Sequence, residues 1–465
     1  MGQTTFDRLR EYLAQLPPQS QALLMREYER AIARNEDVKV ASFVLEELRK
    51  VVRGNVDAVR PRVEDPTRLA FRSLEPFLVE GVAAVRPGQI RRASLLAVWQ
   101  WLEREGAVEA VREFEDAAAA PDASPSEVER AVRKFQQAAA DAILKAVAPG
   151  PGGDRNRGMA RIGQPHAVED LPGIGAVLKA RDALDGFAGK VPSVLRSFGD
   201  SQIASINAAL NTPSLVTPQV LPFALSLLMQ RLAAPWQIIR LAVKIAASDD
   251  EIRVAATSYG VAVTMAIQDL SRVAGSMRSR IKRGEFKSIG EHLKTVHDGV
   301  RGLRTELDLR NDSTWGRQLA SIRVEISSTL QSEIESVPGR VRRLLRQRPD
   351  KDIAANSQID PAEVEEAAAL IDFVAVCRTY ASELAINEVT LRTYSDLQQY
   401  VEKSTESLVQ SLRNGNPKVK PFRQMQAKAA IRFCQVLFGA EYAQQMSRAA
   451  DSAMVVVERK PSRAG

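Results

Sequence analysis

Apolar residues recur every three or four positions along most of the 465-residue chain. The clearest runs lie at 267–281, 289–307 and 370–384, where steps of three and four alternate. This spacing places the apolar side chains on one stripe of a helix, which must be buried against another helix. The alternation of apolar and polar residues that is typical of strands is scarce. The pattern therefore predicts an all-α fold made of helical bundles in more than one domain.

Local signals mark where several of these helices begin or end. Ser124-Pro125 and Asp360-Pro361 each place a capping side chain before a proline, with an acidic residue close behind. Arg283-Gly284 separates two apolar stripes, which predicts an antiparallel helical hairpin. A third stripe, Ile322–Val337, is expected to end at Pro338-Gly339, because proline and glycine interrupt helices. The middle of the chain is therefore predicted to be an elongated bundle with short turns.

Two stretches rich in proline, glycine and polar residues divide the chain, at 148–168 and 349–361. Such compositions are typical of linkers, because proline and glycine do not continue helices. The predicted units are an N-terminal helical domain at 1–147, a central bundle with a basic face at 169–348, a C-terminal helical domain at 362–457 and a disordered tail at 458–465.

Composition and hydropathy favour a cytoplasmic protein. The longest uncharged stretch, 201–230, contains three prolines and two asparagines, so it does not predict a membrane-spanning helix. Charged residues from Asp7 onward interrupt the N-terminus before an apolar core of secretory length. Cys377 and Cys434 are the only cysteines, which excludes a disulfide scaffold. Both are expected to be buried core thiols.

Charge is the most informative local feature. The chain has 64 Lys and Arg and 57 Asp and Glu, a formal charge of +7. Residues 271–348 alone hold 17 basic and 9 acidic side chains, so this segment carries +8 and the rest is almost neutral. Two clusters dominate it and supply the candidate binding residues. The first cluster is Arg278, Arg280, Lys282, Arg283 and Lys287, and the second cluster is Arg340, Arg342, Arg343, Arg346 and Arg348.

A concentrated basic surface can neutralise the phosphates of nucleic acid or of an anionic membrane. No aromatic residue interleaves with the second cluster, and no helix-turn-helix, zinc-finger or RNA-recognition signature accompanies it. A solvated, arginine-rich face without a ligand is the alternative interpretation. Whether the two clusters merge in space is left open by the sequence.

Three shorter segments each allow a functional and a structural interpretation. Leu171–Gly175 resembles the hairpin of the helix-hairpin-helix DNA-binding motif, but Leu178 and Lys179 stand where that motif has small residues, so a loop leading into a helix from Ala176 is the favoured interpretation. Arg91–Leu95 matches a basophilic kinase consensus, or Ser94 is structural. Ala234–Ile245 combines an apolar face with two cations, as an interfacial helix does, or it belongs to a central core.

Catalytic and cofactor motifs do not emerge. The histidines are His166, His292 and His297, and the last two are five positions apart, about 140° around a helix, so they cannot face one metal ion. Phosphate-binding, nucleophile-elbow and dinucleotide fingerprints are lacking. No cofactor and no metal site are therefore expected.

These observations predict a non-enzymatic helical scaffold or adaptor that binds another macromolecule through helical faces, with a protein as the expected partner. The first alternative is a peripheral binder of nucleic acid or of an anionic membrane through the two basic clusters. The second alternative is an enzyme with an unfamiliar helical active site. The oligomeric state is left open.

Overall fold

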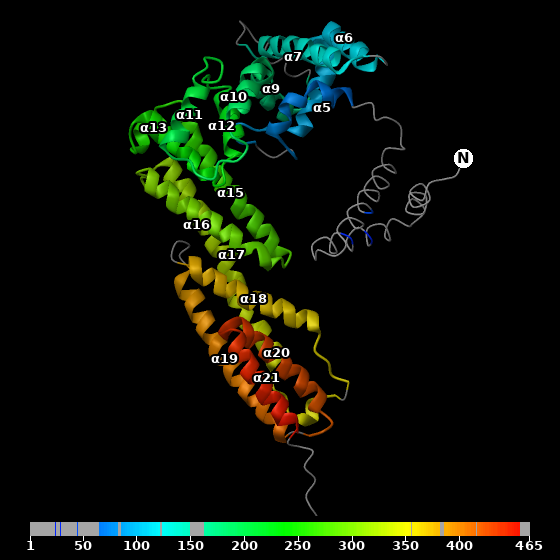
Figure 1. The fold of residues 1–465 in the computed structure, drawn as a ribbon, viewed down its shortest axis with the longest axis vertical. Helices are drawn as coiled ribbons and strands as arrows, with labels where there is room; N and C mark the ends of the chain where they lie inside the picture. Colours follow the sequence, from blue (N-terminus) through cyan, green and yellow to red (C-terminus); the bar gives the residue numbers. More distant parts are fainter. Residues whose placement is uncertain are drawn as a thin grey trace, which may run out of the picture. The chain divides into compact units, whose positions relative to one another are not determined.

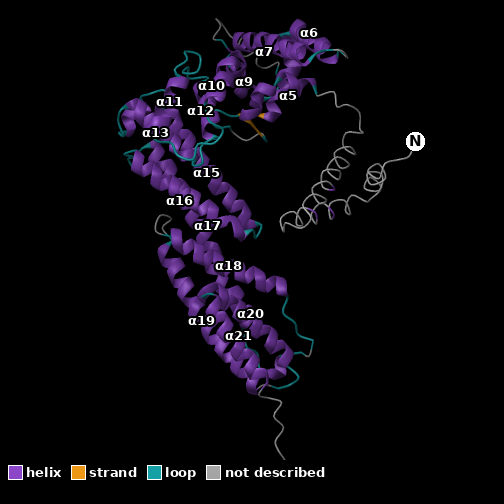
Figure 2. Cartoon of the chain, in the orientation of Figure 1, coloured by secondary structure: helices purple, strands orange, loops and turns teal. Residues whose placement is uncertain are grey.

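The structure is a computed structural model. It describes residues 65–81, 85–120, 123–148, 162–354, 356–381, 386–414 and 416–455, together with Leu24, Tyr28 and Val44. Helices dominate these residues (Figure 2), which confirms the prediction of an all-α fold. Strands β1 (Leu78–Val79) and β2 (Ile90–Arg91) form a short parallel ladder, with Leu78 opposite Ile90.

The contacts within the chain group it into two compact units. The first unit contains the described residues up to Glu75 and Ala93–Val168, and the second contains Pro76–Arg92 and the described residues from Glu169 onward. The predicted three-domain division stays a prediction. Residues 149–161 of its first linker and its tail at 458–465 lie outside the described residues.

The first unit is built around an aromatic cluster. Its elements are α4 (Pro66–Ala70), the 3₁₀ turn η1 (Arg72–Phe77), which runs on into the second unit, α5 (Arg92–Trp101), the π-helical turn η2 (Leu102–Gly106), α6 (Val108–Ala119) and α7 (Pro125–Val147). Phe71, Trp99, Phe114 and Phe135 are buried, with ring centroids 5.3–6.2 Å apart. The helix start predicted at Ser124 is confirmed, because Ser124 and Glu127 form a capping box.

After β1 and β2, the second unit continues with seven short or medium helical elements, the first of which starts in the last residues of the first unit. They are α9 (Pro165–Lys179), α10 (Arg181–Lys190), α11 (Asp200–Leu210), α12 (Leu221–Met229), η3 (Pro235–Ile238), α13 (Ile239–Ala246) and α14 (Glu251–Ala255). The expected loop at Leu171–Gly175 is wrong, since these residues lie inside α9, and with it the hairpin resemblance fails. Gly173 instead lets α9 approach the Phe223 ring on α12 closely. Ile239, Leu241 and Ala242 of α13 are buried, which favours the core interpretation of Ala234–Ile245.

Three longer helices follow (Figure 1): α15 (Gly260–Lys282), α16 (Ile289–Glu306) after the turn η4 (Phe286–Ser288), and α17 (Thr314–Leu345). The hairpin predicted at Arg283-Gly284 is confirmed, and Gly284 has a φ of 76°. The predicted end of the third helix at Pro338-Gly339 is wrong, because α17 continues to Leu345. Val337, Val341 and Leu345 extend its buried stripe, so packing outweighs the hydrogen bond that proline removes.

The end of α17 packs into a second group of helices. This group contains the turn η5 (Asp350–Asp352), α18 (Pro361–Tyr380), α19 (Asn387–Asn414), α20 (Lys420–Phe438) and α21 (Ala440–Val455). The predicted helix start at Asp360 is confirmed, since its side chain accepts a hydrogen bond from the Ala362 amide at 2.8 Å. Among the described residues, no helix is both long enough and apolar enough to cross a membrane.

Candidate functional site

The second basic cluster lies at the end of α17 and in the irregular segment that follows it. Arg340, Arg342 and Arg343 belong to the last turns of the helix, and Arg346 ends it by leaving the helical region, with φ −57° and ψ 117°. Arg348 is separated from η5 by Pro349 alone. Arginines suit this position, because cations offset the negative end of the helix dipole.

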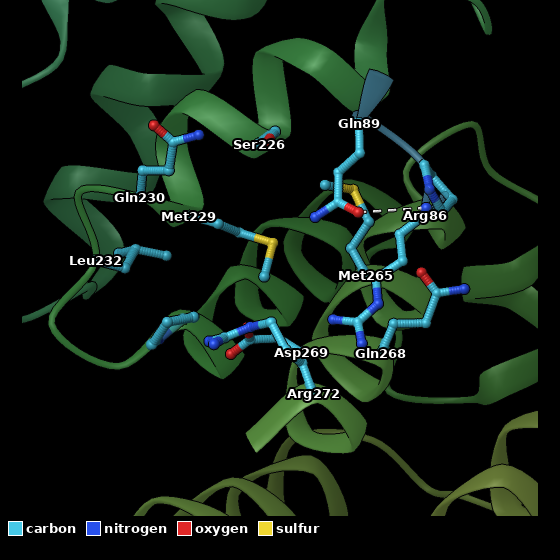
Figure 3. Close-up of a pocket in the computed structure, with 12 residues that line it drawn as sticks. Arg86, Gln89, Ser226, Met229, Gln230, Leu232, Met265, Gln268, Asp269 and Arg272 are labelled. Atoms are coloured by element: carbon cyan, nitrogen blue, oxygen red, sulfur yellow. Dashed lines mark hydrogen bonds and ion pairs between the residues drawn. The ribbon is translucent and has the colours of Figure 1, made fainter. Parts of the chain in front are cut away.

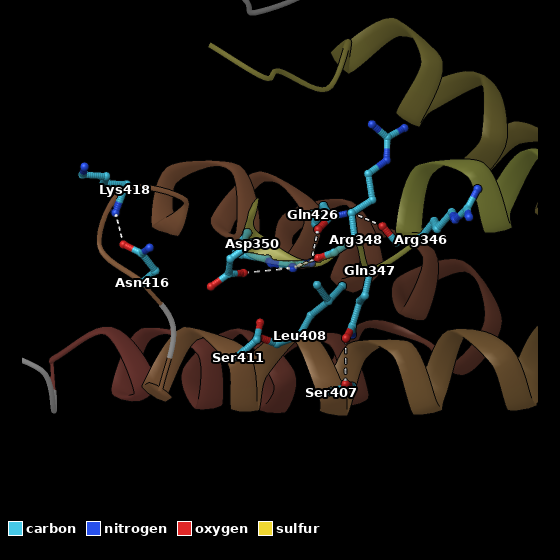
Figure 4. A network of polar contacts seen from close by, with 11 residues as sticks. Arg346, Gln347, Arg348, Asp350, Ser407, Leu408, Ser411, Asn416, Lys418 and Gln426 are labelled. Carbon is cyan, nitrogen blue, oxygen red and sulfur yellow. Dashed lines mark hydrogen bonds and ion pairs between the residues drawn. The ribbon is translucent and has the colours of Figure 1, made fainter. Parts of the chain in front are cut away.

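Two buried side chains of α20 hold the backbone of this segment (Figure 4). The Gln426 amide donates to the carbonyl oxygens of Leu344, at 3.2 Å, and Arg346, at 3.0 Å. The Arg423 guanidinium donates to the carbonyl oxygen of Arg348 and to Gln426 Oε1, and it forms an ion pair with Asp350 at 3.4 Å. Arg423 and Gln426 are only 6% and 1% exposed. Alternate carbonyl groups at the helix end are therefore satisfied inside the protein.

This anchoring leaves the guanidinium groups on the outside. Gln347 turns toward α19 and binds Ser407 at 3.2 Å, whereas the Arg346 and Arg348 side chains point away from α19 (Figure 4). Arg343, Arg346 and Arg348 are exposed. No carboxylate of the described residues forms an ion pair with any of them. These three arginines, which we call the α17-end triad, are thus displayed on a fixed backbone.

Arg340 and Arg342 are engaged differently. Arg340 forms an ion pair with Glu366 of α18. The Arg342 guanidinium lies 5.7 Å from the centroid of the Tyr400 ring, in a cation–π contact. It also lines a groove of about 530 Å³ together with Arg392 and the carboxylates Glu335, Glu388 and Asp396. Both arginines therefore already have partners within the bundle.

The first basic cluster is largely compensated by acidic neighbours at the α15–α16 hairpin. Arg278 pairs with Glu325 at 2.9 Å, and Glu285 pairs with both Arg280, at 3.5 Å, and Arg283, at 2.7 Å. The hydrogen bonds that Arg283 donates to the Glu285 carboxylate raise the pKa of Arg283 and lower the pKa of Glu285. Lys282 is exposed at the end of α15, and Lys287 lies in η4.

The two clusters lie at different levels of the bundle. The first cluster lies beside Glu325 of α17, because Arg278 forms an ion pair with that residue. Arg340 follows Glu325 by 15 residues on the same helix, about 22 Å farther along its axis. The described contacts bring no member of one cluster onto a member of the other.

His292, His297 and the two cysteines lie within helices. The His292 ring donates from Nδ1 to the Ser288 carbonyl at 2.8 Å, and His297 contacts Asp298 at 3.1 Å. Cys377 and Cys434 are buried, as predicted, and burial raises the pKa of both thiols. Across the described ranges, no group of three or more His, Cys, Asp or Glu side chains is placed to hold a metal ion.

Sequence reasoning found the α17-end triad but missed Arg423 and Gln426, which position it. The available signal was a pair of polar residues, Arg423 and Gln426, three positions apart on a helical stripe that otherwise holds Ala427, Ala430 and Phe433. No protein-family model, no curated protein and no solved structure matches the chain.

Proposed function

We propose that this protein is a non-enzymatic helical scaffold that binds the phosphate backbone of a nucleic acid through the α17-end triad. The observation that supports the proposal is the combination of exposure and anchoring at Arg343, Arg346 and Arg348. Their guanidinium groups have no carboxylate partner among the described residues, while Arg423 and Gln426 hold the backbone that carries them.

Guanidinium groups suit a phosphate ligand. Each has a planar fork of N–H donors that can bind two phosphate oxygens at once, and it stays charged at any physiological pH. Because the backbone is held by buried groups, the cations lose less conformational freedom on binding than they would on a loose tail. Backbone phosphates are contacted without regard to base sequence, so we expect binding that depends strongly on salt and weakly on sequence.

The neighbouring side chains favour a nucleic acid over a membrane. An interfacial helix needs an apolar face that inserts between lipids. Leu344 and Leu345, which lie between the arginines, are only 7% and 1% exposed and pack inward. The triad is therefore a purely cationic surface.

A protein interface has less support. The large apolar side chains that are exposed among the described residues come from separate elements, as scattered surface residues do. They are Leu96, Val108, Leu144, Val194, Ile252, Val324 and Leu391. The protein partner and the enzymatic activity weighed from the sequence stay predictions.

Fluorescence anisotropy with a labelled mixed-sequence DNA duplex and the matching single strand tests the proposal. The variant R343Q/R346Q/R348Q should bind at least about tenfold more weakly, and the slope of log K against log salt should become shallower by about 2.7 for the duplex. The matched control is R301Q/R304Q/R317Q, which removes three exposed arginines elsewhere in the same unit.

Three results would count against the proposal. The first is no binding of either DNA to the unaltered protein at low salt. The second is an equal loss of affinity in the control variant, which would indicate a diffuse charge effect. The third is binding to vesicles containing phosphatidylserine but not to DNA, which would assign the triad to a membrane surface.

A further inference from the structure

A cavity of about 310 Å³ lies in the second unit between α12, α15 and the turn at residues 86–89 (Figure 3). Met265, Gln268, Asp269 and Arg272 of α15 line one wall, since their spacing of three, four and seven places them on one helical face. The remaining lining residues are Arg86, Pro87, Gln89, Ser226, Met229, Gln230, Leu232 and Pro235. The wall thus combines two cations, one carboxylate, carboxamides and two methionines.

Gly88 determines where the turn lies. It has a φ of 78°, and a Cβ at this position would overlap the carbonyl oxygen of Pro222 in the first turn of α12. Only glycine therefore lets the turn sit so close to α12. The Arg86 amide donates to Gln89 Oε1 at 3.4 Å, which turns the amide nitrogen of Gln89 toward the cavity (Figure 3). The opposite wall is held by Gln230, whose amide donates to the Pro76 carbonyl at 2.7 Å.

The charges around the cavity are unbalanced. Arg272 donates from Nε, at 3.0 Å, and from Nη2, at 2.8 Å, to the same oxygen of Asp269. Arg86 is half-buried and lines the same cavity. Burial lowers the pKa of Arg86, the charge of Arg272 lowers it further, and Asp269 opposes both effects. In the cavity lining, the carboxylate of Asp269 is therefore the one negative charge that offsets the two guanidinium groups of Arg86 and Arg272. A bound anion would reduce the repulsion between these two cations.

We propose that this cavity binds a small organic anion, a carboxylate or a phosphate ester. Arg86 and Arg272 bind the anionic oxygens. Met229 and Met265 contact the short carbon skeleton. The site is independent of the α17-end triad, because it shares no residue with it.

Isothermal titration calorimetry on the full chain tests this site with sn-glycerol 3-phosphate, lactate and inorganic phosphate, and with glycerol as the uncharged control. We expect at least one organic anion to bind and glycerol not to bind. Tighter binding of glycerol phosphate or of lactate then distinguishes a phosphate from a carboxylate ligand. Binding of inorganic phosphate alone would contradict the predicted contacts of Met229 and Met265 with the carbon skeleton.

Variants separate binding from folding. Arg86→Gln should weaken the organic anion about tenfold or more, because it removes a charge-assisted hydrogen bond. Arg253→Gln on α14, outside the cavity, should leave the affinity unchanged. Arg272→Gln should weaken binding to a similar degree, while the melting temperature of the free protein stays close to that of the unaltered protein, because the Arg272 side chain is 58% exposed and such ion pairs contribute little to stability.

The proposal is wrong if none of the three anions binds the unaltered protein at millimolar concentration. It is also wrong if Arg86→Gln and Arg272→Gln both bind the anion as tightly as the unaltered protein.

Discussion

The Arg91 guanidinium and the Asp170 carboxylate form a buried ion pair, with Nη1 and Oδ1 3.0 Å apart and the side chains 4% and 1% exposed. The other oxygen of Asp170 accepts the Arg91 amide at 3.0 Å, and Arg91 Nη2 reaches Glu169 at 2.8 Å. The pair joins β2 to α9. Since Arg91 and Ser94 are both buried, the pair also favours the structural interpretation of the kinase-like segment.

Breaking this pair should strongly destabilise the second unit. Asp170→Asn leaves the buried guanidinium short of a carboxylate, and we expect the free energy of unfolding to fall by about 3 kcal/mol. Urea unfolding followed by circular dichroism measures the change. The matched control is Glu169→Gln, because the Glu169 side chain is 65% exposed and such pairs contribute little. Equal effects of the two variants would contradict the assigned role of Asp170.

Gly302 of α16 lies directly against the indole of Trp236 in η3, and a Cβ there would overlap ring atoms. Gly302→Ala should therefore destabilise the protein by about 2 kcal/mol, since the half-buried ring must move to make room for the added methyl group. Gly275→Ala on α15 should have the opposite sign, because the space around Gly275 is open and alanine favours a helix by about 1 kcal/mol. Thermal unfolding of the two variants compares them, and a stabilised Gly302→Ala would refute this packing.

Burial of the Cys377 thiol makes stability depend on alkaline pH. Burial raises the pKa of Cys377, so the folded state holds its proton more tightly than the unfolded state does. This contribution is complete below the unfolded pKa, about 8.5, and is lost as pH rises above it. The free energy of unfolding should consequently fall between pH 8.5 and 10 more steeply in the unaltered protein than in Cys377→Ala. Identical pH profiles would exclude the effect.

The same burial should suppress the reactivity of the thiol. Iodoacetamide modification of Cys377 and Cys434 should be slow in the folded protein and fast in urea, because the thiolate is the reactive form. Peptide mass spectrometry distinguishes the two sites. Rapid labelling of native Cys377 would contradict its buried position.

The hydrogen bonds of the Gln426 amide should protect the end of α17 from cleavage by proteases. Gln426→Leu leaves the carbonyl oxygens of Leu344 and Arg346 without their donor, at a cost of about 1–3 kcal/mol. Trypsin should then cleave the Arg346–Gln347 bond faster than in the unaltered protein. Gln435→Leu is a control on the same helix, because it lies away from these carbonyls. Unchanged cleavage at Arg346 in Gln426→Leu would show that other contacts hold this segment.

The periodicity alone predicted the helices α15, α16, α17 and α18. The starts at Ser124 and Asp360 and the hairpin at Gly284 were predictable because caps and turns depend on neighbouring residues. The two wrong boundaries share a cause. Pro172 and Pro338 lie inside helices because distant partners, such as Phe223 against Gly173, compensate for the lost hydrogen bond.

The candidate binding residues were also only partly predictable from the sequence. Charge counting found Arg343, Arg346 and Arg348, since they are close together in sequence. It could not separate them from Arg278 and Arg283, because only the structure shows which arginines have an acidic neighbour.

The sequence by itself thus determined the all-α class, many of the helices and the position of the excess charge, since these follow from local spacing and composition. Only the tertiary structure decided which cations are held and displayed at the end of α17, and that Arg86 meets Arg272 around one cavity. Both outcomes depend on contacts between residues far apart in the chain, which form when helices pack and which no local pattern encodes.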